Sequence, residues 1–155
     1  SVGDLLRFEE QRRNVTISVS APDELPLLAA DPDQFQQVLV ILVMNACDAC
    51  ESGGNIVISA CAVDEAPTGW SRIRIDVSDD GHGIPKEDRT RVFDPFFTTK
   101  KRGKGTGLGL TVAAQIARNH GAEIELESEP GRGTRVTLLW PAASQVADGI
   151  HESTG

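Results

Sequence analysis

The segment from residue 31 to residue 54 constrains the fold of this chain more than any other. Asp31 is a favourable N-cap, Pro32 suits the first helical position, and Gln34 can complete a capping box. Apolar side chains then recur at helical spacing, at positions 35, 38, 39, 42, 43, 46 and 49. The segment therefore predicts one long helix with a buried face, which ends at the Ser-Gly-Gly of residues 52–54.

The other segments predict strands and a second long helix. Residues 15–19, 55–63 and 72–78 have strand patterns, and residues 124–128 and 134–140 predict a last strand pair around a turn at 129–131. Residues 107–119 predict a helix that stops at His120 and Gly121, and a loop over 79–106 holds a short helix near 86–91. The order predicts an α+β two-layer sandwich, in which helices cover one face of a mixed, mostly antiparallel sheet. A doubly wound sheet is excluded because two strand connections carry no helix.

The chain has the length of a single domain. Its 155 residues can bury enough apolar surface to fold without disulfides or a metal. We expect residues 13–141 to form this domain, residues 1–12 to end an upstream helical region, and residues 142–155 to be a flexible tail. The first residue is Ser1 rather than Met, which suggests a fragment or a processed product. The longest apolar run is far shorter than the ~20 residues of a membrane-spanning helix, and no signal peptide opens the chain.

Charge and cysteine content limit the partners and the compartment. The net charge of −8 disfavours binding to nucleic acid or to anionic lipid. Lys100, Lys101, Arg102 and Lys104 form a basic cluster, which is either a solvated loop or a local anion site. Three cysteines, at positions 47, 50 and 61, argue against a disulfide framework and for a reducing compartment. The C-x-x-C at 47–50 lies in the long helical pattern, and small half-buried helix residues explain it better than a redox or metal site.

Two candidate sites precede the basic cluster. Asn45 lies on or beside the buried stripe of the first long helix, where a polar side chain needs a partner. It is either a satisfied helix-edge residue or a neutral oxygen ligand for a hard cation such as Mg2+. Residues 79–83 read D-D-G-H-G directly after a strand. The Asp79 carboxylate can accept from an exocyclic amino group and glycines allow a close approach to a flat ligand, although a simple turn has the same pattern.

Two glycine-rich segments follow. The G-T-G-L-G at 105–109 opens a helix with Lys104 in front, and free N–H groups at a helix start bind phosphate. Its spacing is neither the dinucleotide fingerprint nor the P-loop. The G-R-G-T at 131–134 enters the last strand and alone is equally consistent with an ordinary hairpin turn.

The conjunction of these motifs is more specific than its parts. Asn45, D-x-G-x-G at 79–83, F-D-P-F-F-T-T-K at 93–100, G-x-G-x-G at 105–109 and G-x-G-T at 131–134 follow one another in this order. They resemble the N, G1, F, G2 and G3 boxes in the ATP-binding catalytic domain of two-component sensor histidine kinases, most closely the nitrogen-regulation type. The resemblance covers about residues 15–140. The wider superfamily, with the Bergerat ATP-binding fold, includes type II topoisomerase, mismatch-repair and chaperone ATPases.

The resemblance implies a role for each matching residue. Asn45 is expected to hold Mg2+ as the catalytic and metal-binding residue, and Asp79 to read adenine in a pocket that Thr134 supports. Phe96 is expected to anchor a lid, and Lys100 and Lys104 by position and charge to neutralise the polyphosphate. The expected nucleotide-binding set is Asn45, Asp48, Asp79, Gly81, Gly83, Ile84, Phe96, Lys100, Lys104, Gly105, Thr106, Gly107, Leu108, Gly109 and Thr134.

Two positions depart from the family pattern. Many members carry a second Asn four residues before the Mg2+ ligand, where this chain has Ile41, and Lys or Arg three residues after it, where this chain has Asp48. The ATPase branches carry a Glu general base at the position of Ile41. Isoleucine accepts no proton, so we expect slow hydrolysis and transfer of the phosphoryl group to another acceptor.

The acceptor histidine of the family lies in a separate helical hairpin. His82, His120 and His151 lack its sequence context, and His120 fits a helix end instead. The resemblance implies a histidine-containing dimerisation domain of the same protein and a downstream response regulator as partners. It also implies a monomeric, cytoplasmic fragment whose parent protein can be membrane-anchored. The alternatives are a serine kinase of the anti-sigma-factor type, a topoisomerase-like ATPase that Ile41 disfavours, and a non-catalytic docking module.

Overall fold

The computed structural model describes residues 2–22, 29–50, 53–65, 70–91 and 109–143. Its helices and strands follow the predicted order along the chain. They are α1 (Val2–Arg13), β1 (Val15–Ser20), α2 (Pro32–Ala49), β2 (Gly54–Glu65), β3 (Trp70–Asp79), the 3-10 helix η1 (Lys86–Arg91), α3 (Gly109–Asn119), β4 (Glu123–Glu129) and β5 (Gly133–Pro141).

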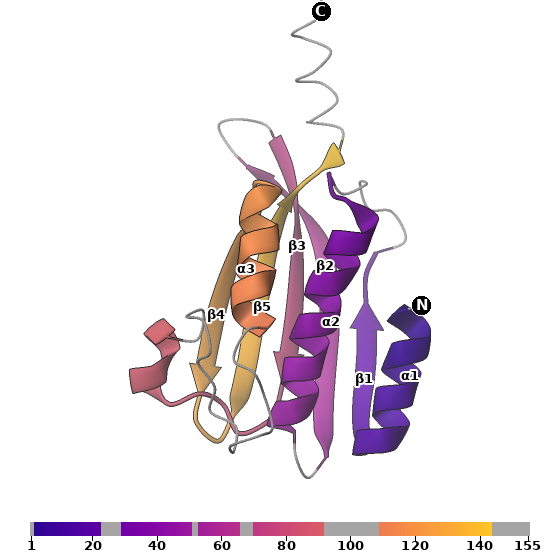
Figure 1. The fold of residues 1–155 in the computed structure, drawn as a ribbon, viewed down its shortest axis with the longest axis vertical. Coiled ribbons are helices and arrows are strands. Elements are labelled where there is room, and N and C mark those ends of the chain that lie inside the picture. Colours follow the sequence, from indigo (N-terminus) through magenta and orange to yellow (C-terminus); the bar gives the residue numbers. More distant parts are fainter. Residues whose placement is uncertain (1, 23–28, 51–52, 66–69, 92–108, 144–155) are drawn as a thin grey trace, which may run out of the picture.

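The five strands form one mixed sheet in the order β1-β2-β3-β5-β4. β1 and β2 pair in parallel, because the chain between them crosses over through α2, and the other pairs are antiparallel. α2 and α3 lie side by side over one face of the sheet, and α1 lies next to β1 at its edge (Figure 1). This arrangement confirms the predicted two-layer α+β sandwich.

The helix α2 begins as predicted and ends earlier. The Asp31 carboxylate accepts from the N–H groups of Asp33 at 2.9 Å and Gln34 at 3.3 Å. The predicted end at residues 52–54 is wrong, because the last helical residue is Ala49. The N–H of Cys50 donates to the carbonyl of Cys47 at 3.1 Å, which tightens the last turn and closes the helix before the glycines.

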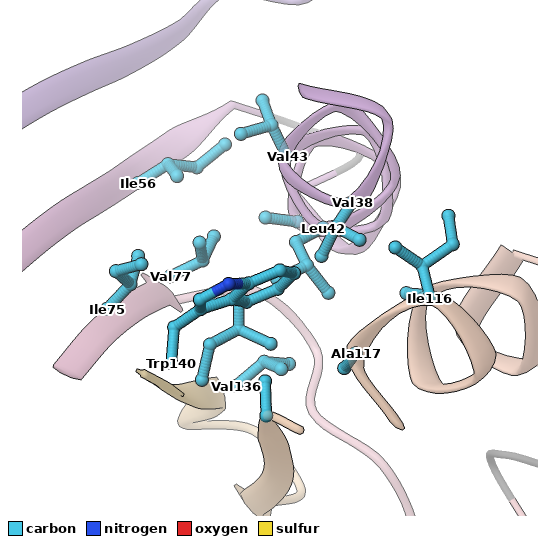
Figure 2. Packing of buried hydrophobic residues seen from close by; sticks show 14 of the residues in the cluster. Val38, Leu42, Val43, Ile56, Ile75, Val77, Ile116, Ala117, Val136 and Trp140 are labelled. Atoms are coloured by element: carbon cyan, nitrogen blue, oxygen red, sulfur yellow. The ribbon is translucent and has the colours of Figure 1, made fainter. Parts of the chain in front are cut away.

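The core lies between the two long helices and the sheet. Trp140 of β5 is fully buried and lies beneath Leu42 of α2, with Ile116 and Ala117 of α3 to one side (Figure 2). Ile73, Ile75 and Val77 alternate along β3 and point into this core, as their period of two predicts.

The edges of the fold depart from the sequence pattern in small ways. Val19 is 66% exposed although it continues the apolar row of Val15, because β1 is the edge strand of the sheet. α1 packs against the domain through Leu6, and its Glu10 carboxylate accepts from the N–H of Ile17 at 2.8 Å.

Among the residues the structure describes, no helix is long and apolar enough to cross a membrane. All three cysteines are free thiols.

Candidate functional site

Three apolar rows of the sheet end in polar residues at the same end of the molecule. On the helix-covered face, the β3 row of Ile73, Ile75 and Val77 ends at Asp79, and the rows of β5 and β4 end at Thr134 and Ser128. Asp79 pairs in register with Thr134, and Thr134 pairs with Ser128. The three polar side chains therefore lie next to one another at the margin of the core.

Asp79 is held by backbone donors in a partly buried position. Its carboxylate accepts from the N–H of Gly81 at 2.9 Å and from the backbone N–H of Thr134. Burial nevertheless raises the pKa of Asp79 above the usual carboxyl value, because the two hydrogen bonds do not fully offset the loss of solvent. Its remaining oxygen lone pairs can accept hydrogen bonds from a ligand.

The neighbouring Asp80 points to a different set of partners. Its carboxylate accepts from the backbone N–H of Asn55 at 2.8 Å and from the Asn55 side-chain amide at 3.0 Å. These hydrogen bonds, the backbone one first, lower the pKa of Asp80. The Cys50 thiol lies 3.8 Å from the same carboxylate, and burial is the main cause that raises the pKa of Cys50 to about 11. A buried thiol that resists ionisation is unreactive, which agrees with a structural role for the C-x-x-C.

Glycines let the loop after β3 lie against two other elements. A Cβ at Gly81 would overlap the carbonyl of Ala49 at the end of α2, and the N–H of His82 donates to that carbonyl at 3.1 Å. Gly83 has a φ of +73°, and a Cβ there would overlap the carbonyl of Glu129 in the β4–β5 hairpin. The loop is thereby fixed between the end of α2 and the hairpin.

Ser128 joins the loop to the hairpin, and the sequence analysis missed it. Ser128 is 5% exposed, and its hydroxyl accepts from the N–H of Ile84 at 2.7 Å. It also lies 3.1 Å from the carbonyl of Gly133 and 2.8 Å from the hydroxyl of Thr134. The available signal was the alternation Ile124, Leu126, Ser128, which puts a polar residue at the end of an inward-facing row.

Asn45 lies where α2 meets the start of α3. An ideal Cβ on Gly109 would be 3.8 Å from the Nδ2 and 4.0 Å from the Oδ1 of Asn45, and 3.3 Å from the Cγ2 of Ile41. The fold thus brings Asn45 next to the last glycine of the G-x-G-x-G segment, 64 positions along the chain (109 − 45). A Cβ at Gly109 would require the Ile41 side chain to shift by a few tenths of an ångström.

The remaining predicted site residues have separate positions. Asp48 is half-buried in the last turn of α2, and that turn contains no basic residue. Within the described part of the chain, no group of three or more His, Cys, Asp or Glu side chains is placed to hold a metal ion. Seven predicted residues lie outside the described ranges, namely Phe96, Lys100, Lys104, Gly105, Thr106, Gly107 and Leu108.

The chain is similar in sequence to known kinases and ATPases. Residues 30–144 match the family described as histidine kinase-, DNA gyrase B-, and HSP90-like ATPase. The chain is 36% identical over 138 residues to sporulation kinase E of Bacillus subtilis (strain 168), an alignment that covers 89% of this chain and 18% of that protein. It is 37% identical over 137 residues to the sensor histidine kinase ZraS of Escherichia coli (strain K12), covering 88% of this chain and 28% of ZraS.

Two solved structures have a similar fold. The nucleotide-free catalytic domain of histidine kinase ThkA superposes with a TM-score of 0.73 at 31% identity, over 90% of this chain and 88% of that one. Full-length ShkA in complex with AMPPNP superposes with a TM-score of 0.76 at 26% identity, over 92% of this chain and 29% of ShkA. The chain therefore spans most of the length of the ThkA catalytic domain and less than a third of the length of the longer relatives.

Proposed function

Because this chain belongs to the histidine kinase-, DNA gyrase B-, and HSP90-like ATPase family, we propose that it binds Mg-ATP and donates the γ-phosphoryl group to a histidine on a separate domain of the same protein. The observation that carries the proposal is the meeting of Asp79, Thr134 and Ser128 at the end of the sheet nearest to Gly81 and the last turn of α2. Asn45 lies one helical turn before Ala49, against the start of α3. Hydrogen-bond acceptors that suit a base and an amide oxygen that suits a cation therefore lie on either side of one region.

The adenine end of the site is assigned to Asp79. Its carboxylate offers only acceptors, which suits the exocyclic amino group of adenine, a donor. Gly81, Gly83 and Ile84 shape the loop that would cover the base, and Thr134 lies beside Asp79 in register. The raised pKa of Asp79 reflects burial that would also favour a flat, largely apolar base.

The phosphate end is assigned to the start of α3 and to Asn45. Free N–H groups at a helix start carry partial positive charge and bind phosphate, so we assign this role to residues 105–109 together with Lys100 and Lys104. Mg2+ prefers oxygen ligands and keeps phosphates and waters in its shell, so one amide oxygen from Asn45 suits it. When bound, Mg2+ would neutralise charge on the phosphates.

Ile41 favours transfer over hydrolysis. Its side chain packs where α2 meets Gly109 and has no group that can accept a proton from water. Phosphoryl transfer needs positioning and charge neutralisation, and the acceptor must come from elsewhere. We therefore propose that a histidine-containing dimerisation domain of the same protein completes the reaction and that a response regulator acts downstream. We propose residues 13–141 as the catalytic domain, monomeric when isolated.

Titration calorimetry of the chain with ATP, with and without Mg2+, tests the binding site. We expect Mg2+-dependent binding, and a loss of about tenfold or more in affinity for Asn45→Ala and for Asp79→Asn, because each removes one interaction of a charged group. Thermal melting of both variants checks that the fold is intact. Wild-type affinity in either variant would remove that residue from the site.

Phosphoryl transfer is tested by mixing this chain with the dimerisation domain of its own parent protein and γ-labelled ATP. We expect label on a histidine of that domain, and very little free phosphate from the chain alone. Steady hydrolysis without transfer would instead indicate an ATPase. Binding without either reaction would indicate a docking module.

A further inference from the structure

The hydroxyl of Ser128 has three partners, and the bonds between them can be assigned. A serine hydroxyl donates one hydrogen bond and accepts two. The N–H of Ile84 can only donate and the carbonyl of Gly133 can only accept, at 2.7 and 3.1 Å from the Ser128 oxygen. The third partner, the hydroxyl of Thr134 at 2.8 Å, can do either. All three contacts become hydrogen bonds only if Ser128 donates to Gly133 and Thr134 donates to Ser128.

This assignment fixes what Thr134 can offer a ligand. Its single hydroxyl proton is directed at Ser128, so only its lone pairs remain. Thr134 lies in register with Asp79, whose carboxylate also only accepts. Ser128 is 5% exposed, so bulk water does not compete for its bonds. The side chains of ionised Asp79 and of Thr134 therefore offer only acceptors to a ligand at this end of the sheet.

Such a set of acceptors distinguishes the two common purine bases. At the same ring position, adenine carries an amino group that donates and guanine carries a carbonyl that accepts. We propose that Ser128 is a positioning residue that sets the base preference of the pocket, by holding the Thr134 hydroxyl as an acceptor that favours ATP over GTP. The inference rests on the proposed function, since it takes the base of the nucleotide to lie at Asp79.

Ser128 also holds the loop that shapes the pocket. Its bond to the N–H of Ile84 fixes one end of the segment that follows Asp79. The carbonyl of His82 accepts from the N–H of Gly131 at 2.8 Å, so the same loop is tied to the hairpin twice. Loss of the Ser128 hydroxyl would loosen the loop and so weaken the binding of ATP and GTP alike. It would change the ratio of the ATP affinity to the GTP affinity only through Thr134. The two effects can be separated by experiment.

The test measures the affinities of the full 155-residue chain for ATP and for GTP by calorimetry at one Mg2+ concentration. The variants are Ser128→Ala, Thr134→Val and the double variant. Thr134→Val removes the acceptor and leaves the hydroxyl of Ser128 in place for Ile84. Ser78→Ala is the matched control, because Ser78 precedes Asp79 on β3 and its side chain points to the opposite face of the sheet.

We expect each single variant to narrow the ATP-to-GTP affinity ratio by about three- to tenfold, which is the effect of one neutral hydrogen bond. The double variant should narrow it no further than Thr134→Val does, since without the Thr134 hydroxyl Ser128 has nothing to orient. An unchanged ratio, including an equal loss for both nucleotides, would overturn the inference while leaving the proposed function standing. Wild-type chain that binds no ATP would overturn both. If Ser128→Ala does not fold, Ser128→Cys takes its place and is judged by the same ratio, because a thiol is a much weaker hydrogen-bond partner than a hydroxyl.

Discussion

At the scale of single residues, two adjacent carboxylates have opposite environments. Asp79 loses solvent at the margin of the core, and this burial raises its pKa. Asp80 stays exposed and its bonds from Asn55 lower its pKa. β3 ends at Asp79 and the chain turns at Asp80, so one position in the chain separates the proposed ligand-binding carboxylate from a structural one. A sequence pattern shows two aspartates and does not show this difference.

The two aspartates should affect stability with opposite dependence on pH. Because the pKa of Asp79 is raised in the folded state, the native protein binds the Asp79 proton more tightly than the unfolded protein does. The wild-type protein should therefore gain stability relative to Asp79→Asn as the pH falls through the folded-state pKa. The pKa of Asp80 is lowered in the folded state, so its effect on stability has the opposite sign. The wild-type protein should lose its higher stability relative to Asp80→Asn as the pH falls below about 4. Melting temperatures from pH 3 to pH 8 measure both differences. Parallel curves for the two variants would contradict the assignment.

At the scale of elements, the site depends on a close contact between the loop after β3 and the end of α2. Gly81 lies against the carbonyl of Ala49, which also accepts from the N–H of His82. The same helix places Asn45 against the start of α3. α2 is therefore the element that aligns the proposed base and cation positions with each other.

Gly81→Ala should disrupt this contact. The new Cβ meets a backbone carbonyl that cannot move without loss of its hydrogen bond, so we expect a loss of about 1–3 kcal/mol in the free energy of unfolding and weaker ATP binding. Gly121→Ala is the control. Gly121 has a φ of +71° and follows α3 at its far end, and a Cβ there would meet only the Pro141 ring at an ordinary contact distance of 3.8 Å, so the change should cost about 1 kcal/mol without a change in affinity. Urea denaturation and calorimetry measure both quantities, and equal affinity in the two variants would exclude the contact as a determinant of the site.

At the scale of the whole molecule, the proposed site lies at one end of the sheet and a cluster of packing contacts around Trp140 lies at the other. Thr134 and Trp140 lie six positions apart on β5, about 20 Å along the strand. The indole N–H of Trp140 donates to the carbonyl of Ala29 at 3.0 Å. The Phe35 ring packs edge-on against the indole, with 5.0 Å between the ring centroids. His120 ends α3 as predicted, with its Nδ1 at 2.8 Å from the carbonyl of Ile116 and its Nε2 accepting from the N–H of Asp31 at 3.3 Å. This end fastens the start of α2, the end of α3 and the sheet together.

Trp140→Phe should therefore lower stability without changing the site. The variant loses the bond to Ala29 and part of the buried ring, and we expect a decrease of about 1–3 kcal/mol in the free energy of unfolding. Affinity for ATP should stay within about twofold, because the substitution lies at the other end of the domain. Denaturation and calorimetry on the same preparation test this. A parallel fall in affinity would mean that the two ends are coupled.

The sequence by itself determined the kind and order of the elements and the family. The periodicity around Val38 and Leu42 predicted α2, the alternation of Ile73, Ile75 and Val77 predicted β3, and both are local properties of the chain. The resemblance carried by the five boxes is confirmed by the family match over residues 30–144. The end of α2 was misplaced because a tightened last turn at Cys50, rather than the glycines, closes the helix.

Only the tertiary structure decided which polar groups meet. Strand register places Ser128 beside Thr134 and Thr134 beside Asp79, and register depends on pairing between segments far apart in the sequence. Packing of α2 on α3 brings Asn45 to Gly109, and the turn after β3 divides Asp79 from Asp80. Hydrogen bonding and burial depend on contacts between segments that are far apart in the sequence. The sequence therefore specifies which polar groups are available, and the tertiary structure specifies which partners they have.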